Sequence, residues 1–217
     1  MYEAVIFDFD GVLLDSSVDS FQWANQARRE EIERRGWDIE LDGFEQGIFE
    51  PHHAEDIAPF LREKSISWHQ LRLLEEAVAE RKVELVEANE MVLFPSAEEV
   101  LRSIDIPKAV VSNAYDNALD HIIKLLGLDE LLDFWTAPSL SEIESYRDRM
   151  KPEAHMLEYA MESMGVADAV MVGDQVEDIL AAEKAGIDSV FIDRGYYDTV
   201  PEPDHRIEIL EEILEIV

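Results

Sequence analysis

Two aspartates separated by one residue stand near the start of the chain. Asp8 interrupts the apolar run Ala4–Phe9, and Asp10 follows it directly. Residues two apart on an extended strand point to the same side, where their carboxylates would repel each other. A bound divalent cation relieves such repulsion, and Gly11 lets the chain turn sharply afterwards. The pattern predicts a cation site, although two acids in a solvated turn would give the same residues.

A second acidic pair follows another apolar run. Asp174 and Asp178 come after Ala169–Val172 and are four residues apart, so they share a face if a helix starts at this point. Their oxygen ligands are of the hard kind that suits Mg²⁺. Asp178 could instead be a first-turn acid stabilised by the helix dipole, without a role in metal binding.

Groups that could bind an anion lie between these acidic pairs. Ser112 and Asn113 follow the apolar run Ala109–Val111, where a hydroxyl and the backbone N–H groups beside it can donate to a phosphate oxygen. Lys151 precedes an expected helix that begins at Pro152, so its charge adds to the helix dipole. Helix capping and an ordinary surface lysine are the simpler explanations for each feature alone.

Together these residues match the needs of phosphoryl transfer. That reaction requires a nucleophile, positive charge for the phosphoryl oxygens and a proton donor for the leaving group. Asp8 would be the nucleophile, Mg²⁺ with Lys151 the positive charge, and Asp10 the proton donor.

Alternating strands and helices have to position these side chains. The pattern predicts a parallel sheet covered by helices on both faces, with ligands bound outside the carboxyl ends of the strands. Residues 17–92 show helical spacing and almost no strand signal, so we expect a helical domain inserted into a core of residues 1–16 and 93–217. The expected strands are Ala4–Phe9, Ala109–Val111, Phe134–Ala137, Ala169–Val172 and Ser189–Ile192. The expected helices of the core are Ser96–Ile104, Asn117–Leu126, Pro152–Met164 and Asp178–Ala185.

The order and spacing of the four clusters resemble the haloacid dehalogenase superfamily of hydrolases. The segment from Asp8 to Ser16 is similar to the first motif of that family, Ser112-Asn113 to the second, Lys151-Pro152 to the third, and Gly173 to Ile179 to the fourth. The position of the helical insert resembles phosphoglycolate phosphatase and β-phosphoglucomutase relatives. The resemblance implies a Rossmann-like, doubly wound α/β core with a helical cap.

The resemblance also implies roles for single residues. Asp8 would attack phosphorus to form an aspartyl-phosphate, and Asp10 would serve as general acid and then as general base. Mg²⁺ would be held by Asp8, the backbone carbonyl of Asp10 and Asp174, with Asp178 either as a further ligand or as a hydrogen-bond partner of the ligands. Ser112, Asn113 and Lys151 would bind the phosphoryl oxygens. We therefore expect a Mg²⁺-dependent hydrolase of small phosphate monoesters.

Several alternatives share the core residues. A phosphomutase of the β-phosphoglucomutase type differs only in how its cap excludes water. A phosphonate hydrolase needs a cap lysine near the nucleophile, and we expect the two cap lysines, Lys64 and Lys82, to be surface charges. Arg62 and Lys64 are the cap cations we expect to contact a substrate anion. A receiver-like protein that only accepts phosphate on Asp8 is the non-enzymatic alternative.

The net charge of the chain limits the kinds of molecule that it can bind. Eighteen Lys and Arg stand against 50 Asp and Glu, which gives a net charge of −32. Such a surface repels nucleic acid and anionic membranes, and no stretch reaches the ~18 apolar residues that span a bilayer. Without cysteines, disulfides and thiolate chemistry are excluded. We expect a cytoplasmic enzyme of small phosphorylated molecules, and the excess of acids suggests a halophilic source.

Overall fold

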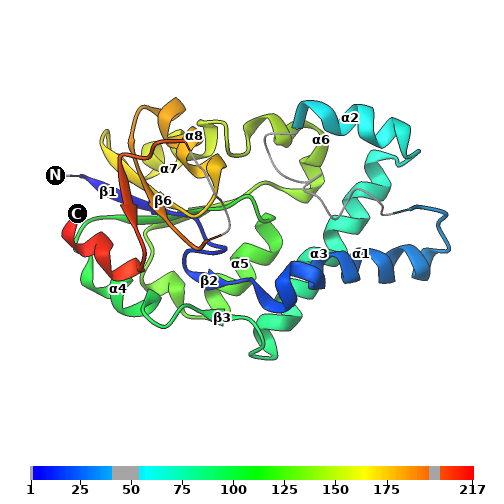
Figure 1. Ribbon diagram of the computed structural model, residues 1–217, viewed down its shortest axis with the longest axis horizontal. Coiled ribbons are helices and arrows are strands. Elements are labelled where there is room, and N and C mark those ends of the chain that lie inside the picture. Colours follow the sequence, from blue (N-terminus) through cyan, green and yellow to red (C-terminus); the bar gives the residue numbers. More distant parts are fainter. Residues whose placement is uncertain (1, 41–53, 196–200) are drawn as a thin grey trace.

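A parallel sheet forms the centre of the larger part of the molecule (Figure 1). The computed structural model describes residues 2–40, 54–195 and 201–217. Six strands lie in the order β5-β4-β1-β6-β7-β8, and every neighbouring pair is parallel. They are β1 (Ala4–Phe7), β4 (Lys108–Val111), β5 (Phe134–Thr136), β6 (Ala169–Gly173), β7 (Asp188–Ile192) and β8 (His205–Ile207).

Helices cover both faces of this sheet. They are α4 (Ala97–Ser103), α5 (Asp116–Leu125), α6 (Ile143–Tyr146), α7 (His155–Met164) and α8 (Val176–Ala185), with short 3-10 segments at Leu128–Glu130, Leu140–Glu142, Arg147–Arg149 and Leu210–Glu215. Successive side chains of a strand point to opposite faces. Ala4 and Ile6 accordingly pack in one apolar cluster with α7 and α8, whereas Val5 and Phe7 pack in another with α4 and α5. The expected doubly wound α/β fold is thus confirmed.

The helices of the insert lie to one side of the sheet (Figure 1). They are α1 (Gln22–Arg35), α2 (Ala54–Glu63) and α3 (Trp68–Glu87), preceded by a 3-10 turn at Val18–Phe21. The chain leaves the core through β2 (Leu14–Asp15) and returns through β3 (Val92–Leu93), and these two strands pair antiparallel. The chain therefore leaves and rejoins the core at neighbouring points. The division into a core and a cap of residues 17–92 stays a proposal.

Helix α3 links the insert to the core. Its N-terminus is fixed by a capping box, in which Ser67 accepts a hydrogen bond from the Gln70 amide at 3.2 Å and donates one from its own amide to the Gln70 side chain at 2.9 Å. The helix packs against α1 on one side and α5 of the core on the other. Its apolar residues Leu71 and Leu74 join the same cluster as Val5 and Phe7. The position of α3 relative to the sheet is therefore fixed by buried contacts.

Two helix starts differ from the sequence expectation, and one strand was not expected at all. Helix α7 begins at His155 and not at Pro152, because residues 151–154 form a turn before the helix. Helix α8 begins at Val176, so Asp174 precedes the helix and does not share a helical face with Asp178. Strand β8 at His205–Ile207 was not expected, since its sequence has no apolar run.

No helix in the described ranges is both long and apolar enough to cross a lipid bilayer. The expected cytoplasmic location stays a prediction.

Candidate active site

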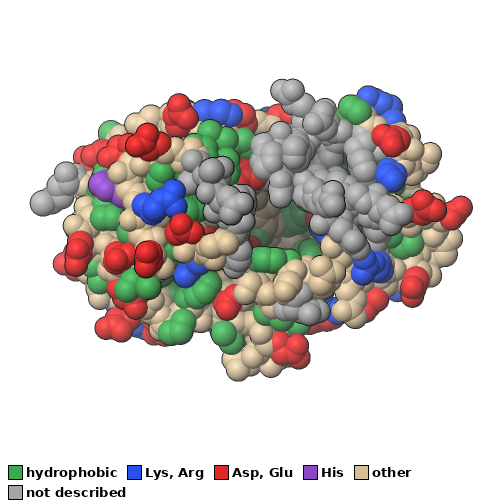
Figure 2. Space-filling model, viewed as in Figure 1, with side chains coloured by type: hydrophobic (Ala, Val, Ile, Leu, Met, Phe, Trp, Pro, Cys, Tyr) green, Lys and Arg blue, Asp and Glu red, His purple; other side chains and the backbone are tan. Residues whose placement is uncertain are grey.

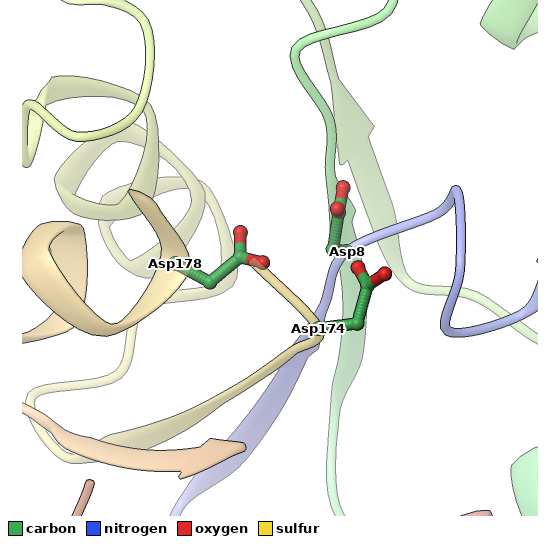
Figure 3. Close-up of side chains that lie close together, drawn as sticks. All are labelled: Asp8, Asp174 and Asp178. Atoms are coloured by element: carbon green, nitrogen blue, oxygen red, sulfur yellow. The ribbon is translucent and has the colours of Figure 1, made fainter. Parts of the chain in front are cut away.

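Three aspartates meet where β1 and β6 end. Asp8, Asp174 and Asp178 each offer a carboxylate oxygen that lies within 4.8 Å of the others, and all three residues are buried. Figure 3 shows their carboxyl groups turned toward a common space, from the chain after β1, the chain after β6 and the first turn of α8. Since β1 and β6 are parallel neighbours, their carboxyl ends bring together residues more than 160 positions apart in the sequence.

Two glycines allow this close approach. At Gly11 the backbone φ is +74°, and a Cβ built there would lie 2.1 Å from Asp174 Oδ2. A Cβ at Gly173 would lie 2.2 Å from the Asp178 side chain. Any larger residue would displace one of the carboxyl groups, so both positions require glycine.

Lys151 lies among the carboxyl groups, with only 1% of its surface exposed. Its Nζ is 2.9 Å from Asp8 Oδ1 and 2.6 Å from Asp178 Oδ1, and it donates a hydrogen bond to the Val111 carbonyl at 2.9 Å. Burial alone would lower the pKa of Lys151, but Asp178 and Asp8 outweigh it and the pKa is raised above its usual value. The ammonium therefore stays charged and pairs with two of the three aspartates.

Burial also changes the proton affinity of the acids. It raises the pKa of Asp8 to about 7, with Lys151 opposing and Asp178 reinforcing the shift. It raises the pKa of Asp174 to about 8, reinforced by Asp8 and Asp178. Both carboxyl groups are thus harder to ionise than free aspartate unless a further positive charge arrives.

The donor set fits a divalent cation. Asp174 Oδ1 is buried and has no hydrogen-bond partner within the described ranges, while its Oδ2 accepts a bond from the Gln175 side chain at 3.0 Å. A cation at the three carboxyl groups would occupy that oxygen and offset the cost of burying the acids. Oxygen-only ligands of this kind suit Mg²⁺ or Ca²⁺.

The predicted phosphate-binding residues lie beside Lys151. Ser112 is buried after β4, and its hydroxyl accepts a hydrogen bond from the Ala114 amide at 3.1 Å. The Asn113 side chain bonds the Lys151 backbone twice, donating to its carbonyl and accepting from its amide, both at 3.0 Å. Asn113 therefore ties the end of β4 to the turn before α7. A direct contact of Ser112 or Asn113 with phosphate stays a prediction.

Asp10 lies apart from the triad and faces the insert. Its Oδ2 is 2.5 Å from Nζ of Lys82 on α3. Lys82 is 5% exposed, and its ammonium lies 5.5 Å from the centre of the Phe9 ring. The expectation that Lys82 is a surface charge is wrong, because α3 packs against the core and turns this residue inward.

The sequence contained a signal for Lys82. The lysine continues the helical spacing of Leu71, Leu74 and Val78, so it falls on the apolar side of α3. A charge at such a position needs a buried partner, and Asp10 provides it. Arg62, by contrast, lies exposed on α2, and Lys64 is half-buried in the turn that follows.

Arg194 holds the loop after the first aspartates in place. Its Nε donates to the Gly11 carbonyl at 2.7 Å, and its guanidinium lies 3.8 Å from the centre of the Phe94 ring. The chain after β7 is thereby joined to the turn at Gly11 and to the segment after β3. The surface shown in Figure 2 is hollowed near its centre, between the part that holds the sheet and the part that holds α1 and α3.

Comparison with known proteins agrees with this geometry. The family model of haloacid dehalogenase-like hydrolases matches residues 2–186. Among curated relatives, a phosphoglycolate phosphatase of Colwellia psychrerythraea is 28% identical over 208 residues, covering 89% of this chain and 85% of the relative. The pyrophosphatase PpaX of Halalkalibacterium halodurans is 25% identical over 231 residues, covering 98% and 95%.

Solved structures share the fold. CbbY from Rhodobacter sphaeroides, in complex with phosphate, superposes with a TM-score of 0.76 at 20% identity and covers 98% of this chain and 96% of its own. A putative phosphoglycolate phosphatase from Lactobacillus plantarum gives a TM-score of 0.72 at 20% identity, with full coverage of both chains. These likenesses extend over core and insert alike.

Proposed function

Because the chain belongs to the haloacid dehalogenase-like hydrolase family, we propose that it hydrolyses small phosphate monoesters with Mg²⁺, through an aspartyl-phosphate on Asp8. The observation that carries the proposal is the meeting of Asp8, Asp174 and Asp178 around Lys151 at one edge of the sheet. A nucleophile, a cation site and a fixed positive charge are thus adjacent, as phosphoryl transfer requires. Relatives named phosphoglycolate phosphatase support a small substrate.

Each residue of the site has a task in this reaction. Asp8 is the nucleophile, and Lys151 holds its Oδ1 at 2.9 Å, which leaves the other carboxylate oxygen to attack phosphorus. Asp8, Asp174, Asp178 and the Asp10 carbonyl would hold Mg²⁺. When bound, the ion favours ionised carboxylates and balances charge on the phosphoryl oxygens. Ser112 and Lys151 bind those oxygens, and Asn113 positions Lys151.

Asp10 acts on the leaving group. It is two residues beyond the nucleophile, and its Oδ1 is buried without a hydrogen-bond partner among the described residues. In the first step Asp10 donates a proton to the leaving oxygen. In the second it takes a proton from the water that attacks the aspartyl-phosphate, which releases inorganic phosphate and restores Asp8.

Turnover of p-nitrophenyl phosphate with Mg²⁺ tests the nucleophile. Asp8→Asn is expected to abolish turnover, whereas Asp168→Asn, an exposed aspartate directly before β6, is expected to keep the activity of the natural protein. Both variants should show the same circular dichroism spectrum. Retained activity in a correctly folded Asp8→Asn protein would contradict the proposal.

A comparison of leaving groups tests Asp10. The p-nitrophenolate ion leaves without a proton, but an alkoxide does not. Asp10→Asn is therefore expected to reduce kcat/KM, which reports the first step, by about 10²- to 10⁴-fold for an alkyl phosphate, and to reduce kcat/KM for the aryl ester much less. An equal loss of kcat/KM for both esters would contradict the role of Asp10 as general acid.

Two enzymatic alternatives remain testable with the same protein. A phosphomutase would convert a hexose phosphate into its isomer without releasing phosphate, so product analysis separates it from a phosphatase. The burial of Lys82 beside Asp10, two residues beyond the nucleophile in sequence, favours a phosphonate hydrolase as the second candidate. That reaction needs a neutral amine for a Schiff base, whereas Lys82 lies against the Asp10 carboxylate as an ion pair. Borohydride trapping of an aldehyde substrate on Lys82 would favour the phosphonate reaction.

A further inference from the structure

The site contains two buried ammonium groups with separate partners. Lys151 comes from the core and balances Asp8 and Asp178. Lys82 comes from the insert, and the partner shown for its ammonium is Asp10, at 2.5 Å. The side chain of Lys82 is only 6% exposed, whereas that of Asp10 is 31% exposed. The carboxyl group can therefore turn toward the open side of the site more easily than the ammonium can leave.

Lys82 marks the leaving-group side of the site. Under the proposed function, Asp10 touches the oxygen that leaves with the alcohol part of the substrate. A group that touches Asp10 from the opposite element borders the space for that alcohol part. Lys82 is held there by α3, which packs against α5 of the core, and by the Phe9 ring beside its ammonium.

Catalysis changes the charge balance around Lys82. When the Asp10 carboxyl group turns toward the leaving oxygen, the ammonium of Lys82 loses the contact that the structure shows for it. A buried charge without a counter-charge is unfavourable, and the loss of one partner of such a pair is strongly destabilising. A substrate with a neutral alcohol part leaves this cost uncompensated, whereas one with a second anionic group compensates it.

We propose that Lys82 is a specificity-determining residue that binds a second anionic group, a carboxylate or a second phosphate, on the alcohol part of the substrate. This proposal rests on the proposed function. The substrate anion takes the place of Asp10 at the ammonium and frees Asp10 for the leaving oxygen. No covalent bond to Lys82 is involved.

Three esters with the same carbon skeleton test the proposal. 2-Phosphoglycolate carries a carboxylate where 2-hydroxyethyl phosphate carries a neutral hydroxymethyl group, and ethylene glycol bisphosphate carries a second phosphate. For the natural protein we expect kcat/KM to favour at least one anionic ester over the neutral one. Lys82→Met should reduce kcat/KM for the preferred anionic ester by about 30-fold or more, mainly through KM, and change the neutral ester by less than about threefold. Which anionic ester is preferred identifies the second group as carboxylate or phosphate.

Lys124→Met is the control, because it removes an exposed lysine of α5 whose ammonium pairs with Asp120 of the same helix. It should leave the preference for the anionic ester intact. Equal losses for all three esters in Lys82→Met, or an unchanged preference, would overturn the proposal and assign Lys82 to cap packing alone. If Lys82→Met does not fold, the same comparison with Lys82→Gln decides. Failure of the proposed function has a different signature, since the natural protein would then not hydrolyse even p-nitrophenyl phosphate.

Discussion

At the scale of single residues, the site concentrates more negative than positive charge in a buried space. Asp8, Asp174 and Asp178 surround one ammonium, and the pKa of each acid is raised by burial. This excess is what a divalent cation would neutralise. The same residues therefore couple proton binding, metal binding and folding stability.

The first prediction concerns pH. Raised pKa values of about 7 for Asp8 and about 8 for Asp174, against the usual 3.8, mean that the folded protein retains protons that the unfolded chain has lost. The stability of the metal-free protein should therefore fall as pH rises from about 4 to about 8. A divalent cation binds the ionised carboxylates, so the increase in Tm caused by Mg²⁺ should grow over the same pH range.

Thermal unfolding at about pH 5 and about pH 8, with and without Mg²⁺, checks this prediction. Asp174→Asn should lose most of the Mg²⁺-dependent increase in Tm, whereas Asp168→Asn should keep it. An increase in Tm that is the same at both pH values would show that these carboxyl groups are not the ones that bind the ion.

Sequence patterns predict most residues of the proposed active site, because each of them lies at the end of a short apolar strand. Asp8, Ser112 and Asp174 were placed by that rule, and parallel pairing of β1 with β4 and β6 brings them to one edge. The environment of Lys82 was missed, since it depends on how α3 packs against the core. Local spacing marked Lys82 as lying on the apolar side of its helix but could not name its partner 72 residues away.

At the scale of elements, loops join segments that lie far apart in the chain. Asn113 connects the end of β4 to the turn before α7, and Arg194 connects the end of β7 to the turn at Gly11. The helix start at His155 could not be predicted from the sequence, because Pro at position 152 is typical of a first helical turn and here lies in the turn before the helix. Strand β8 was not predicted, because its sequence contains no apolar run.

Asn113→Ala is predicted to weaken both folding and substrate binding. The substitution leaves the amide and the carbonyl of Lys151 without their partner, which should lower the free energy of unfolding by about 1 kcal/mol or somewhat more. KM for phosphate monoesters should rise, because Lys151 loses its support. Asn117→Ala, an exposed asparagine of α5, is the control and should change neither urea unfolding nor KM. An unchanged KM in Asn113→Ala would argue against a positioning role.

At the scale of the whole molecule, acidic side chains are spread over the visible face and basic ones are few (Figure 2). A net charge of −32 on 217 residues opposes compaction through mutual repulsion. The described residues at both ends of the chain lie on the side of the sheet away from the insert (Figure 1).

Salt should therefore stabilise the folded chain. Screening shortens the reach of the repulsion from about 10 Å at 0.1 M to about 3 Å at 1 M salt. The urea concentration at the midpoint of unfolding is expected to rise across that range of NaCl concentration. Full stability in dilute buffer, with no further gain on adding salt, would contradict a salt-adapted surface and with it the expected halophilic source.

The aspartyl-phosphate itself gives the most direct test of the account. The natural protein, mixed with a ³²P-labelled phosphate monoester and Mg²⁺ and quenched in acid within milliseconds, should carry label on one peptide. Borohydride reduction should then convert the aspartate at position 8 into homoserine, and omission of Mg²⁺ should abolish the label. Label on another residue, or turnover without any labelled protein in repeated quenches, would contradict Asp8 as the nucleophile.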